Sequence, residues 1–585
     1  MKKILIMFIA VYALAACEMD LYRSDTMTSA MLKSNPAAAV YTTDGNYAML
    51  KDEVEYSNTR SGNDFSRLYF LMHELRGDNT SLCAHSTDPL YEDLIYEDDP
   101  TKADLSYMWF VCYKIIYGCN TNIEAMVEGT PETNHLIGEN YFLRAFCHFT
   151  LCNLFATPYS RGPEKHGVII RKSIDCSKTE RATVGEVYDQ IVNDLKEAMR
   201  LMKDGQPRGN KGYASYDAAR GLLTRVYLYM GKNELCVELC DEMLGTTPAA
   251  NLHPQGIQNY FANTLTSPET IWCIGKNAND PGFVGDGTPS GELGSIYYTP
   301  MGTKMGWCEL FWAEPLIDLI FRHPEDARLA YFHAYSNPSD SKKMITYPHI
   351  DDKNDFRLQG TIRNVEFDVN AETNNVTYLG KTYTVKRTVI NGYPAYYFTN
   401  MYTDAEDKDD IDNGTRCYVR DNVDDIATGL DSKTGTAPIY AMSKFSGQDG
   451  LAMLASPAIL RWAEIILNRA EANAKIGGKD QAVLDDLNVI RTRAGIPTWD
   501  SEADWKAEGY KELLDVVLDE RRLELCFEGQ RALDLYRNNR SIDRRYGGAQ
   551  HYEVLKPERL DEIYPYCIPY EEISVNTHIP GNGKN

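Results

Sequence analysis

The sequence predicts a mainly α-helical protein in which a scaffold of tetratricopeptide-like helix pairs carries long loop-rich insertions and small β elements. Amphipathic segments with helical spacing follow one another from about residue 103 to 245 and resume at about 457. Between these blocks the chain is rich in Gly, Asn, Asp and Tyr. We therefore expect helical parts at 17–250 and 451–585 and a loop-rich insertion at 251–450. The length of 585 residues suggests more than one domain, but no long Ser, Gly or Pro linker divides the chain, so one large body with long insertions is equally plausible.

The helical blocks are broken by short polar segments that contain Gly or Pro. Between residues 213 and 227 small residues alternate with aromatic ones, which lets antiparallel helices approach closely, and Gly231 then precedes a new helix. This pattern resembles a tetratricopeptide unit. The predicted helices are 106–126, 139–155, 184–202, 213–230 and 234–244 in the first block, and 457–476, 480–493 and 510–536 in the second.

The insertion at 251–450 is predicted to contain small sheets, for example around the β-like runs 382–386 and 396–398. Long irregular segments on a rigid scaffold are where recognition usually resides, because the scaffold fixes position and the loops supply variety. We therefore expect ligand-binding loops in this part of the chain.

The first residues form a secretory signal of the lipoprotein kind. Lys2 and Lys3 precede an apolar run at 4–13, which is too short to span a membrane, and Leu-Ala-Ala then leads to Cys17. A lipoprotein signal requires a thiolate at this place to accept diacylglycerol. Residues 1–16 are therefore predicted to be removed, and Cys17 is predicted to carry the lipid that tethers the protein to a membrane.

The composition of the whole chain is that of a globular protein with an acidic surface. The formal net charge is -24, and the mean hydropathy is -0.42 with 43% hydrophobic residues. This charge repels nucleic acid and anionic head groups, so nucleic acid is excluded as a partner. A neutral ligand would be indifferent to the charge, and carbohydrate is the obvious neutral extracellular nutrient.

The cysteines do not form a disulfide or zinc pattern. Thirteen remain after Cys17, an odd number, and many lie in amphipathic stretches, such as Cys147 with Cys152 and Cys236 with Cys240. We expect buried free thiols, although disulfides or zinc remain alternatives.

Five segments, in chain order, carry a family resemblance. The segments are ENYFLRAFCHFTLCNLF at 139–155, LRWAEIILNRAEA at 460–472, VIRTRAG at 489–495, ERRLELCFEGQRALDL at 520–535 and YPYCIPYEEISVN at 564–576. Together they resemble the SusD/RagB family of outer-membrane lipoproteins. The resemblance implies a helical tetratricopeptide-like scaffold on the cell exterior that captures a nutrient, opens like a lid and caps a SusC-like TonB-dependent transporter, without catalysis. It leaves the ligand open between a glycan and, as in RagB-like members, a peptide.

Three carboxylates could suggest a glycoside hydrolase. Glu520, Glu524 and Glu528 fall on one helix stripe, and paired carboxylates are what glycosidases use. However, groups on one regular helix point the same way and leave no room for a sugar between them, and arginines are interleaved for ion pairing. We therefore expect a structural network, a binding protein and no enzyme, with the hydrolase as the alternative from another class.

Sugar binding needs exposed aromatic platforms flanked by hydrogen-bonding groups. Loops are the best candidates, although each ring could equally pack under a loop. Trp312, which closely follows the Gly-rich segment at 294–307, is expected in the core. The candidate ligand-binding residues are Tyr297, Tyr298 and Trp307 in a Gly-rich segment, and Asn79, His85, Tyr91 and Tyr96 in a polar segment that corresponds to a family ligand loop.

No cofactor is predicted. The histidines lack metal-binding spacing, and no nucleotide-binding fingerprint is present. Acidic clusters at 97–99, 404–412 and 421–425 could collect structural calcium, but solvated acidic loops are the preferred interpretation because the spacing of an EF-hand is missing.

Overall fold

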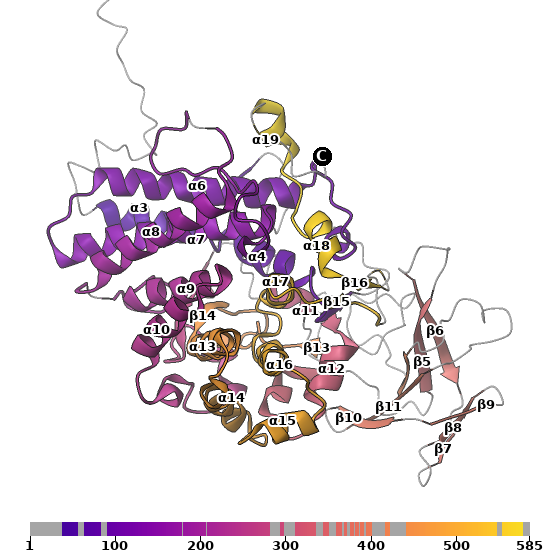
Figure 1. Cartoon of the computed structure of the whole chain (residues 1–585). Coiled ribbons are helices and arrows are strands. Elements are labelled where there is room, and N and C mark those ends of the chain that lie inside the picture. The colour runs from indigo at the N-terminus through magenta and orange to yellow at the C-terminus, as the bar shows by residue number, and fades with distance from the viewer. Residues whose placement is uncertain are drawn as a thin grey trace, which may run out of the picture.

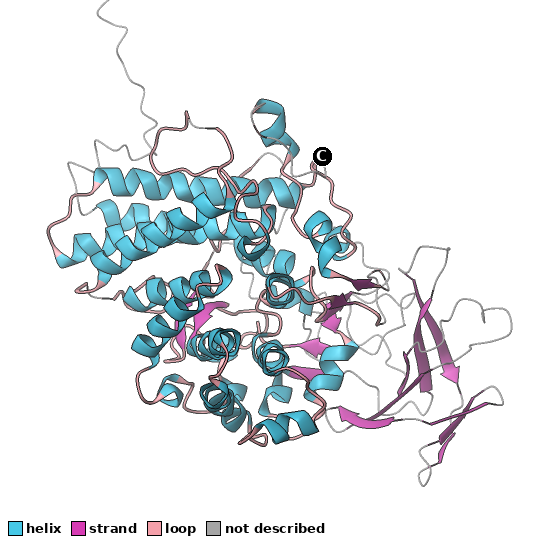
Figure 2. Ribbon diagram, viewed as in Figure 1, coloured by secondary structure: helices cyan, strands magenta, loops and turns pink. Residues whose placement is uncertain are grey.

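A computed structural model confirms the mainly helical fold with small β elements (Figures 1 and 2). One large hydrophobic core takes residues from all three predicted parts of the chain. The structure describes residues 38–56, 64–82, 90–177, 179–205, 207–280, 293–297, 310–334, 440–546, 551, 553–576 and 579, together with the strands between 343 and 421.

The first layer consists of long helices that lie side by side (Figure 1). Two of them begin where the sequence supplies a cap: Thr130 accepts a hydrogen bond from the Thr133 backbone with Pro131 in the first helical turn, and Thr183 forms a capping box with Glu186. The helices of this layer are α3 (Ala38–Ala48), α6 (Ala103–Ala125), α7 (Pro131–Phe155) and α8 (Val184–Met202).

The second layer contains the remaining helix pairs. Helix α10 packs on α9 and α13, and α13 packs on α14 and α16. The helix predicted at 510–536 is divided at Phe527 and Gly529, both of which have positive φ. The bounds are α9 (Tyr216–Tyr229), α10 (Asn233–Leu244), α13 (Trp462–Ile476), α14 (Asp480–Ala494), α15 (Glu502–Ala507), α16 (Leu513–Leu525) and α17 (Arg531–Arg537).

Short helices complete the fold at the edges of these layers. Helix α4 packs between α6 and α17, so it joins the N-terminal and C-terminal parts. Its first turn is capped by Asp64, which accepts a hydrogen bond from the Arg67 backbone. The short helices are α4 (Phe65–Glu74), α5 (Leu90–Leu94), α11 (Leu293–Tyr297), α12 (Glu314–Ile320), α18 (Pro557–Ile563) and α19 (Tyr570–Val575).

The strands form small antiparallel sheets, mostly within the insertion. The largest described sheet has the order β10-β11-β12-β5-β6, and β7-β8-β9 form a three-stranded sheet. Both lie to one side of the helices (Figure 2). The strands of these two sheets are β5 (Lys343–His349), β6 (Leu358–Val365), β7 (Asp368–Asn370), β8 (Asn375–Tyr378), β9 (Lys381–Thr384), β10 (Lys386–Ile390), β11 (Tyr393–Thr399) and β12 (Arg416–Asp421).

Four two-stranded ladders tie distant parts of the chain to the helical body. Trp312, at the end of one of them, is buried as expected and packs edge-on against Phe332. The pairs are β1 (Thr80–Leu82) with β3 (Leu310–Trp312), β2 (Thr270–Cys273) with β14 (Ala458–Arg461), β4 (Phe332–Ala334) with β13 (Tyr440–Met442), and β15 (Ile542–Asp543) with β16 (Val554–Leu555).

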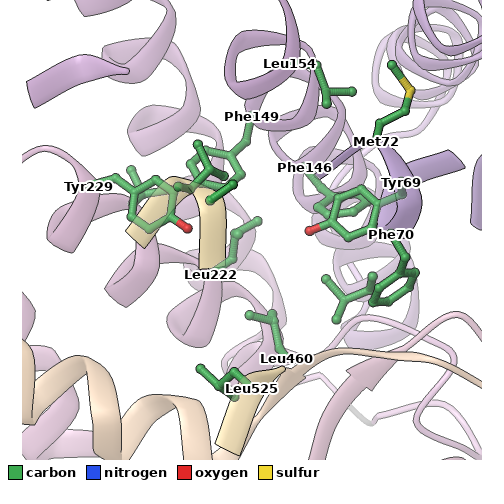
Figure 3. Close-up of a cluster of buried hydrophobic side chains, with 14 of the residues drawn as sticks. Tyr69, Phe70, Met72, Phe146, Phe149, Leu154, Leu222, Tyr229, Leu460 and Leu525 are labelled. Atoms are coloured by element: carbon green, nitrogen blue, oxygen red, sulfur yellow. The ribbon is translucent and has the colours of Figure 1, made fainter. Parts of the chain in front are cut away.

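The core brings aromatic rings from α4 and α7 against aliphatic residues of the second layer (Figure 3). Tyr69 of α4 lies 5.5 Å from Phe146 of α7, measured between ring centroids. Leu222 of α9 and Leu460 of β14 lie in the same cluster. Contacts of this kind across several helices hold the two layers together.

The three carboxylates of the α16 stripe are buried and engaged by cations. Arg461 binds Glu524 at 2.5 Å and Glu528 at 2.8 Å, and Glu520 accepts a hydrogen bond from Arg328 at 2.7 Å. Burial opposes the ionisation of Glu524, but Arg493, Arg461 and Arg328 outweigh it and hold the pKa of Glu524 well below its usual range. The prediction of a structural network at this stripe agrees with these contacts.

A second ionic cluster joins the N-terminal part to the C-terminal helices. Asp78 accepts hydrogen bonds from Arg531, at 2.8 and 3.2 Å, and Arg522 binds the Asp78 carbonyl at 2.7 Å. Arg76 is fully buried, pairs with Asp98 and lies 3.8 Å from the centre of the Tyr566 ring. Buried charges of this kind are tolerated only when they are paired.

The ten described cysteines are free thiols. Nine are buried and only Cys176 is exposed. Burial raises the pKa of several, for example to about 12 for Cys152 and to about 11 for Cys526. These cysteines therefore pack as small apolar residues.

Replacing Glu524 by Gln should destabilise the fold strongly, because Arg461 and Arg493 would lose a buried counter-charge. We expect a loss of about 3–5 kcal/mol in the free energy of unfolding, measured by urea denaturation. Glu502→Gln is the matched control: Glu502 pairs with Lys506 on the exposed face of α15 and should change the value by less than about 1 kcal/mol. Equal stabilities for the two variants would contradict a structural role for the network.

Candidate functional site

A groove of about 730 Å³ lies on the outer side of the first layer. We call it the aromatic groove. Its walls are one face of α6, the short helix α19 and the segment 169–176. The lining residues are Tyr56, Ser106, Trp109, Phe110, Tyr113, Lys114, Tyr117, Asn120, Ile169, Arg171, Ser173, Cys176, Pro569, Glu571, Glu572 and Val575.

The first wall is a stripe of rings along α6. Residues three or four apart share one face of a helix, so the spacing of Phe110, Tyr113 and Tyr117 places their rings on the same face. Phe110 stacks on Tyr56 with ring centroids 4.4 Å apart. Tyr117 is 51% exposed, a large fraction for an aromatic residue at the centre of a long helix. The stripe therefore offers apolar ring surface to the groove.

The second wall, helix α19, is held against α6 by side-chain hydrogen bonds. Glu571 accepts from the Ser106 hydroxyl at 2.7 Å, and Glu572 accepts from the Trp109 indole N–H at 3.1 Å. The Tyr570 backbone N–H donates to the Pro100 carbonyl at 2.8 Å. Figure 1 shows that α19 otherwise stands away from the helical layers. These contacts keep two carboxylates at the groove.

The third wall is the extended segment 169–176, which is fixed by the opposite end of the α6 stripe. The Asn120 amide donates to the Ser173 carbonyl at 2.9 Å, and Glu124 accepts from the Ile174 backbone N–H at 2.8 Å. The Tyr113 hydroxyl exchanges hydrogen bonds with the backbone of Ile169, at 2.9 and 3.0 Å. Tyr113 therefore supports this wall while its ring lines the groove.

Charges of both signs border the rings of the groove. Lys114 lies 5.3 Å from the centre of the Phe110 ring, and Arg171 contributes a guanidinium. Burial, followed by the nearby Glu571 and Glu572 carboxylates, raises the pKa of Tyr56, so its hydroxyl stays protonated and can donate. The groove thus combines apolar faces with hydrogen-bond donors and acceptors at the rim.

The acidic groups of the groove do not form a facing pair. Among the described lining residues, only Glu571 and Glu572 are carboxylates, and both lie on α19. A glycoside hydrolase needs two carboxyl groups on either side of the scissile bond. The geometry therefore suits binding of a ligand between rings and polar groups.

Two family models match the chain. The model described as the SusD family matches residues 259–580, more than half of the chain. A second, described as "Starch-binding associating with outer membrane", matches residues 57–228.

The chain belongs to the SusD family.

Among individual proteins, SusD-like protein P2 of Formosa agariphila is 24% identical over 443 residues, which are 74% of this chain and 71% of that protein. A SusD superfamily structure from Bacteroides thetaiotaomicron covers 95% of this chain and 100% of its own, with a TM-score of 0.66 at 20% identity. A structure described as a laminarin-binding SusD-like protein has a TM-score of 0.58 at 19% identity and covers 94% of this chain and 99% of its own. These structures confirm the SusD fold.

The described residues among those predicted for ligand binding in this SusD family member do not line the aromatic groove. Tyr298, Trp307 and His85 lie outside the described residues. Tyr297 is fully buried and packs 5.4 Å from the Phe527 ring. Its burial leaves no ring face for an external ligand in this arrangement.

The described candidate residues in the polar segment after α4 also pack inside the protein. Asn79 is fully buried; its amide donates to Glu74 at 2.9 Å and accepts from Arg522 at 2.8 Å. Burial raises the pKa of Glu74 to about 7, although Asn79 and the Gly529 backbone N–H counteract it. Tyr96 donates to the Arg76 carbonyl at 2.7 Å, and Tyr91 is half-buried against the core. These residues position helices in the structure.

The rings of the aromatic groove were not among the sequence candidates. Phe110, Tyr113 and Tyr117 lie in a helix that is apolar on most sides, so the core-facing and outward-facing rings look alike in the sequence. The signal that was present is the aromatic repeat at 110, 113 and 117. It becomes informative only when the structure shows that α7 covers the other face.

Within the described part of the chain, no group of three or more His, Cys, Asp and Glu could hold a metal ion. In the acidic cluster at 97–99, Asp98 pairs with Arg76 and Asp99 accepts hydrogen bonds from Thr101. The clusters 404–412 and 422–425 lie outside the described residues. None of the described helices is both long and apolar enough to span a membrane.

Replacing Trp109 by Phe should loosen α19, because Glu572 would lose its indole donor. The lost hydrogen bond is worth about 1–3 kcal/mol, so amide hydrogen exchange in residues 571–576 should accelerate, as measured by mass spectrometry. Trp505→Phe, a buried tryptophan of α15, is the control and should leave exchange in α19 unchanged. Unchanged exchange in Trp109→Phe would show that this bond does not hold the wall.

Proposed function

We propose that this SusD family member is a lipid-anchored protein of the cell surface that captures a glycan without altering it and delivers it to a SusC-like TonB-dependent transporter. The observation that supports the glycan most directly is the aromatic groove, where rings of α6 face a rim of carboxylate, hydroxyl, guanidinium and ammonium groups. A pyranose ring has an apolar C–H face and a hydroxyl edge, and the groove offers a partner for each.

The energetics favour a ligand of several sugars. A single aromatic contact contributes about 0.5–1.5 kcal/mol beyond the burial of its area. Capture of a free nutrient therefore requires several rings acting together, and the groove has the Tyr56–Phe110 stack, Tyr113 and Tyr117. Hydrogen bonds at the rim add orientation, because an unpaired hydroxyl in a half-buried site costs free energy.

Relatives and overall charge support the same ligand class. The second matching family model is described as starch-binding, and one structural neighbour is described as binding laminarin. The formal net charge of -24 disfavours polyanionic ligands, whereas a neutral glycan experiences no long-range repulsion.

Localisation and partner rest on the first residues and on the family. The signal at 1–16 and the acyl acceptor Cys17 support a lipid anchor, and the second family model is described as associating with the outer membrane. The anchored protein would face the cell exterior, where glycans are available. Delivery to a SusC-like transporter follows the resemblance of the five sequence segments.

A peptide ligand, as in RagB-like members, is the alternative within the same fold. Extended peptides are usually held by the free edge of a sheet, through main-chain hydrogen bonds. Two walls of the aromatic groove, α6 and α19, are helices whose central backbone groups are bonded within the helix. This favours a ligand recognised through rings and hydroxyl groups.

A glycoside hydrolase is the alternative from another class. Glu520, Glu524 and Glu528 are buried in ion pairs, and the two carboxylates of the groove share one wall. Release of reducing sugar from a polysaccharide incubated with the purified mature protein would contradict the proposal.

Tyr298, Trp307 and His85 remain proposed ligand contacts. Two binding regions on one protein would raise the avidity for a long polysaccharide, because the second contact becomes intramolecular. Ala substitutions at Tyr298 and Trp307 should therefore be tested together with substitutions in the groove. If both of these variants bind the glycan as tightly as the parent protein does, the groove is the principal site.

Tyr117→Ala should weaken glycan binding by about tenfold through loss of one stacked ring, as measured by titration of the mature protein against a panel of polysaccharides and peptides. Tyr41→Ala is the control, because Tyr41 is 73% exposed on α3 and does not line the groove. An affinity unchanged by Tyr117→Ala but lowered by Trp307→Ala would move the principal site to the loop. Binding of peptides alone would favour the RagB-like alternative.

Cys17→Ala should release the protein from membranes, because no acyl chain could then be attached. The measurement is fractionation of cells followed by a high-salt wash, which removes proteins bound by charge alone. Retention of the variant in the membrane fraction after the wash would contradict the lipid anchor.

A further inference from the structure

The aromatic groove has a repeat along its length. Along α6 the rise is about 1.5 Å per residue, so Phe110 and Tyr113 are about 4.5 Å apart along the axis and Tyr113 and Tyr117 about 6 Å apart. With about 100° of rotation per residue, the three positions fall within an arc of about 60° on one face. The three side chains therefore leave α6 one after another along one face, and we call these positions the three steps.

The three steps differ in how they are supported. At the first, Tyr56 stacks on Phe110, while the Lys114 ammonium lies 5.3 Å from the Phe110 ring centre. At the second, Tyr113 is held through its hydroxyl by the backbone of Ile169. At the third, Tyr117 is the most exposed of the rings. Two steps are therefore fixed in place, and the last lies at the open side of the groove.

The polar rim changes along the same line. Glu571 and Glu572 accept hydrogen bonds from Ser106 and Trp109, near the first step. The segment 171–174 is bound by Asn120 and Glu124, beyond the third step, and brings Arg171 to that end. A ligand lying along the rings would thus meet both carboxylates and the Lys114 ammonium at one end and Arg171 toward the other.

We propose that the aromatic groove binds an extended, linear glycan of the β-1,4-linked type across at least three consecutive sugar units. This inference rests on the proposed function and specifies its ligand. The spacing of these positions along α6 is comparable to the length of one pyranose in an extended chain, so successive sugars can meet successive side chains.

Aromatic residues that follow a straight helix favour a glycan chain that is itself straight. Each pyranose in a β-1,4-linked chain continues the line and presents a C–H-rich face, so all three rings are used. A coiled α-1,4-linked chain curves away from a straight helix after one or two units. The groove should therefore discriminate by linkage more than by the identity of single hydroxyl groups.

The test is the dependence of affinity on chain length. The mature protein is titrated with β-1,4-linked gluco-, manno- and xylo-oligosaccharides of one to six units, and with malto-oligosaccharides of the same lengths. In at least one β-1,4 series, the affinity should rise about three- to tenfold with each unit up to three and then level off. The malto series should gain little after the second unit.

Tyr117→Ala makes the test specific to the row of aromatic residues on α6. This variant should lose the gain from the third unit and keep the gain from the second, whereas Tyr41→Ala should behave as the parent protein does. Affinity independent of length, malto-oligosaccharides bound as tightly as the β-1,4 series, or an equal loss at every length in Tyr117→Ala would overturn the inference.

The outcomes separate this inference from the proposed function. If none of the β-1,4 series binds but another glycan does, the linear ligand is rejected and glycan capture stands. If no glycan binds at all, both are rejected.

Discussion

The buried guanidinium of Arg461 is the interaction on which the arrangement of this protein depends. It binds Glu524 and Glu528 of the C-terminal part and Glu269, which precedes β2. Arg493 and Arg328 bind the same acidic groups from α14 and from the insertion. Each charge is tolerated in the interior only because the others are present, so the segments must come together as one unit. That unit joins β14, α14 and α16 to the start of β2 and to the insertion.

Periodicity in the sequence was sufficient for the long helices. The helix predicted at 184–202 coincides with α8, where Thr183 and Glu186 supply a capping box. The helix predicted at 510–536 is divided, because Phe527 and Gly529 adopt positive φ and a hydrophobic pattern carries no information on such a turn. The strand at 458–461 was assigned to a helix, because its apolar run is too short to distinguish the two and its partner β2, at 270–273, is far away in the chain.

The candidate site was less accessible to sequence reasoning than the fold. Exposure depends on which face of a helix is covered, and Tyr297 is buried although its Gly-rich surroundings suggested a loop. Conversely, Tyr117 sits at the centre of a long apolar helix and is half exposed. The aromatic groove also needs Glu571 and Glu572, which approach α6 only through tertiary folding. Composition and charge, by contrast, require no three-dimensional information, and the neutral ligand that they suggest stays a proposal.

The hydrogen bond between Ser106 and Glu571 joins residues 465 positions apart in the chain. Closing so long a loop costs more conformational entropy than forming neighbouring helix pairs, and such contacts form slowly. Helices α6, α7 and α8 can assemble from local contacts, whereas the wall made by α19 requires the C-terminal part to be in place. A folding intermediate with native helix pairs would therefore have the rings of α6 but no groove. The ability to bind ligand would arise only in the last stage of folding.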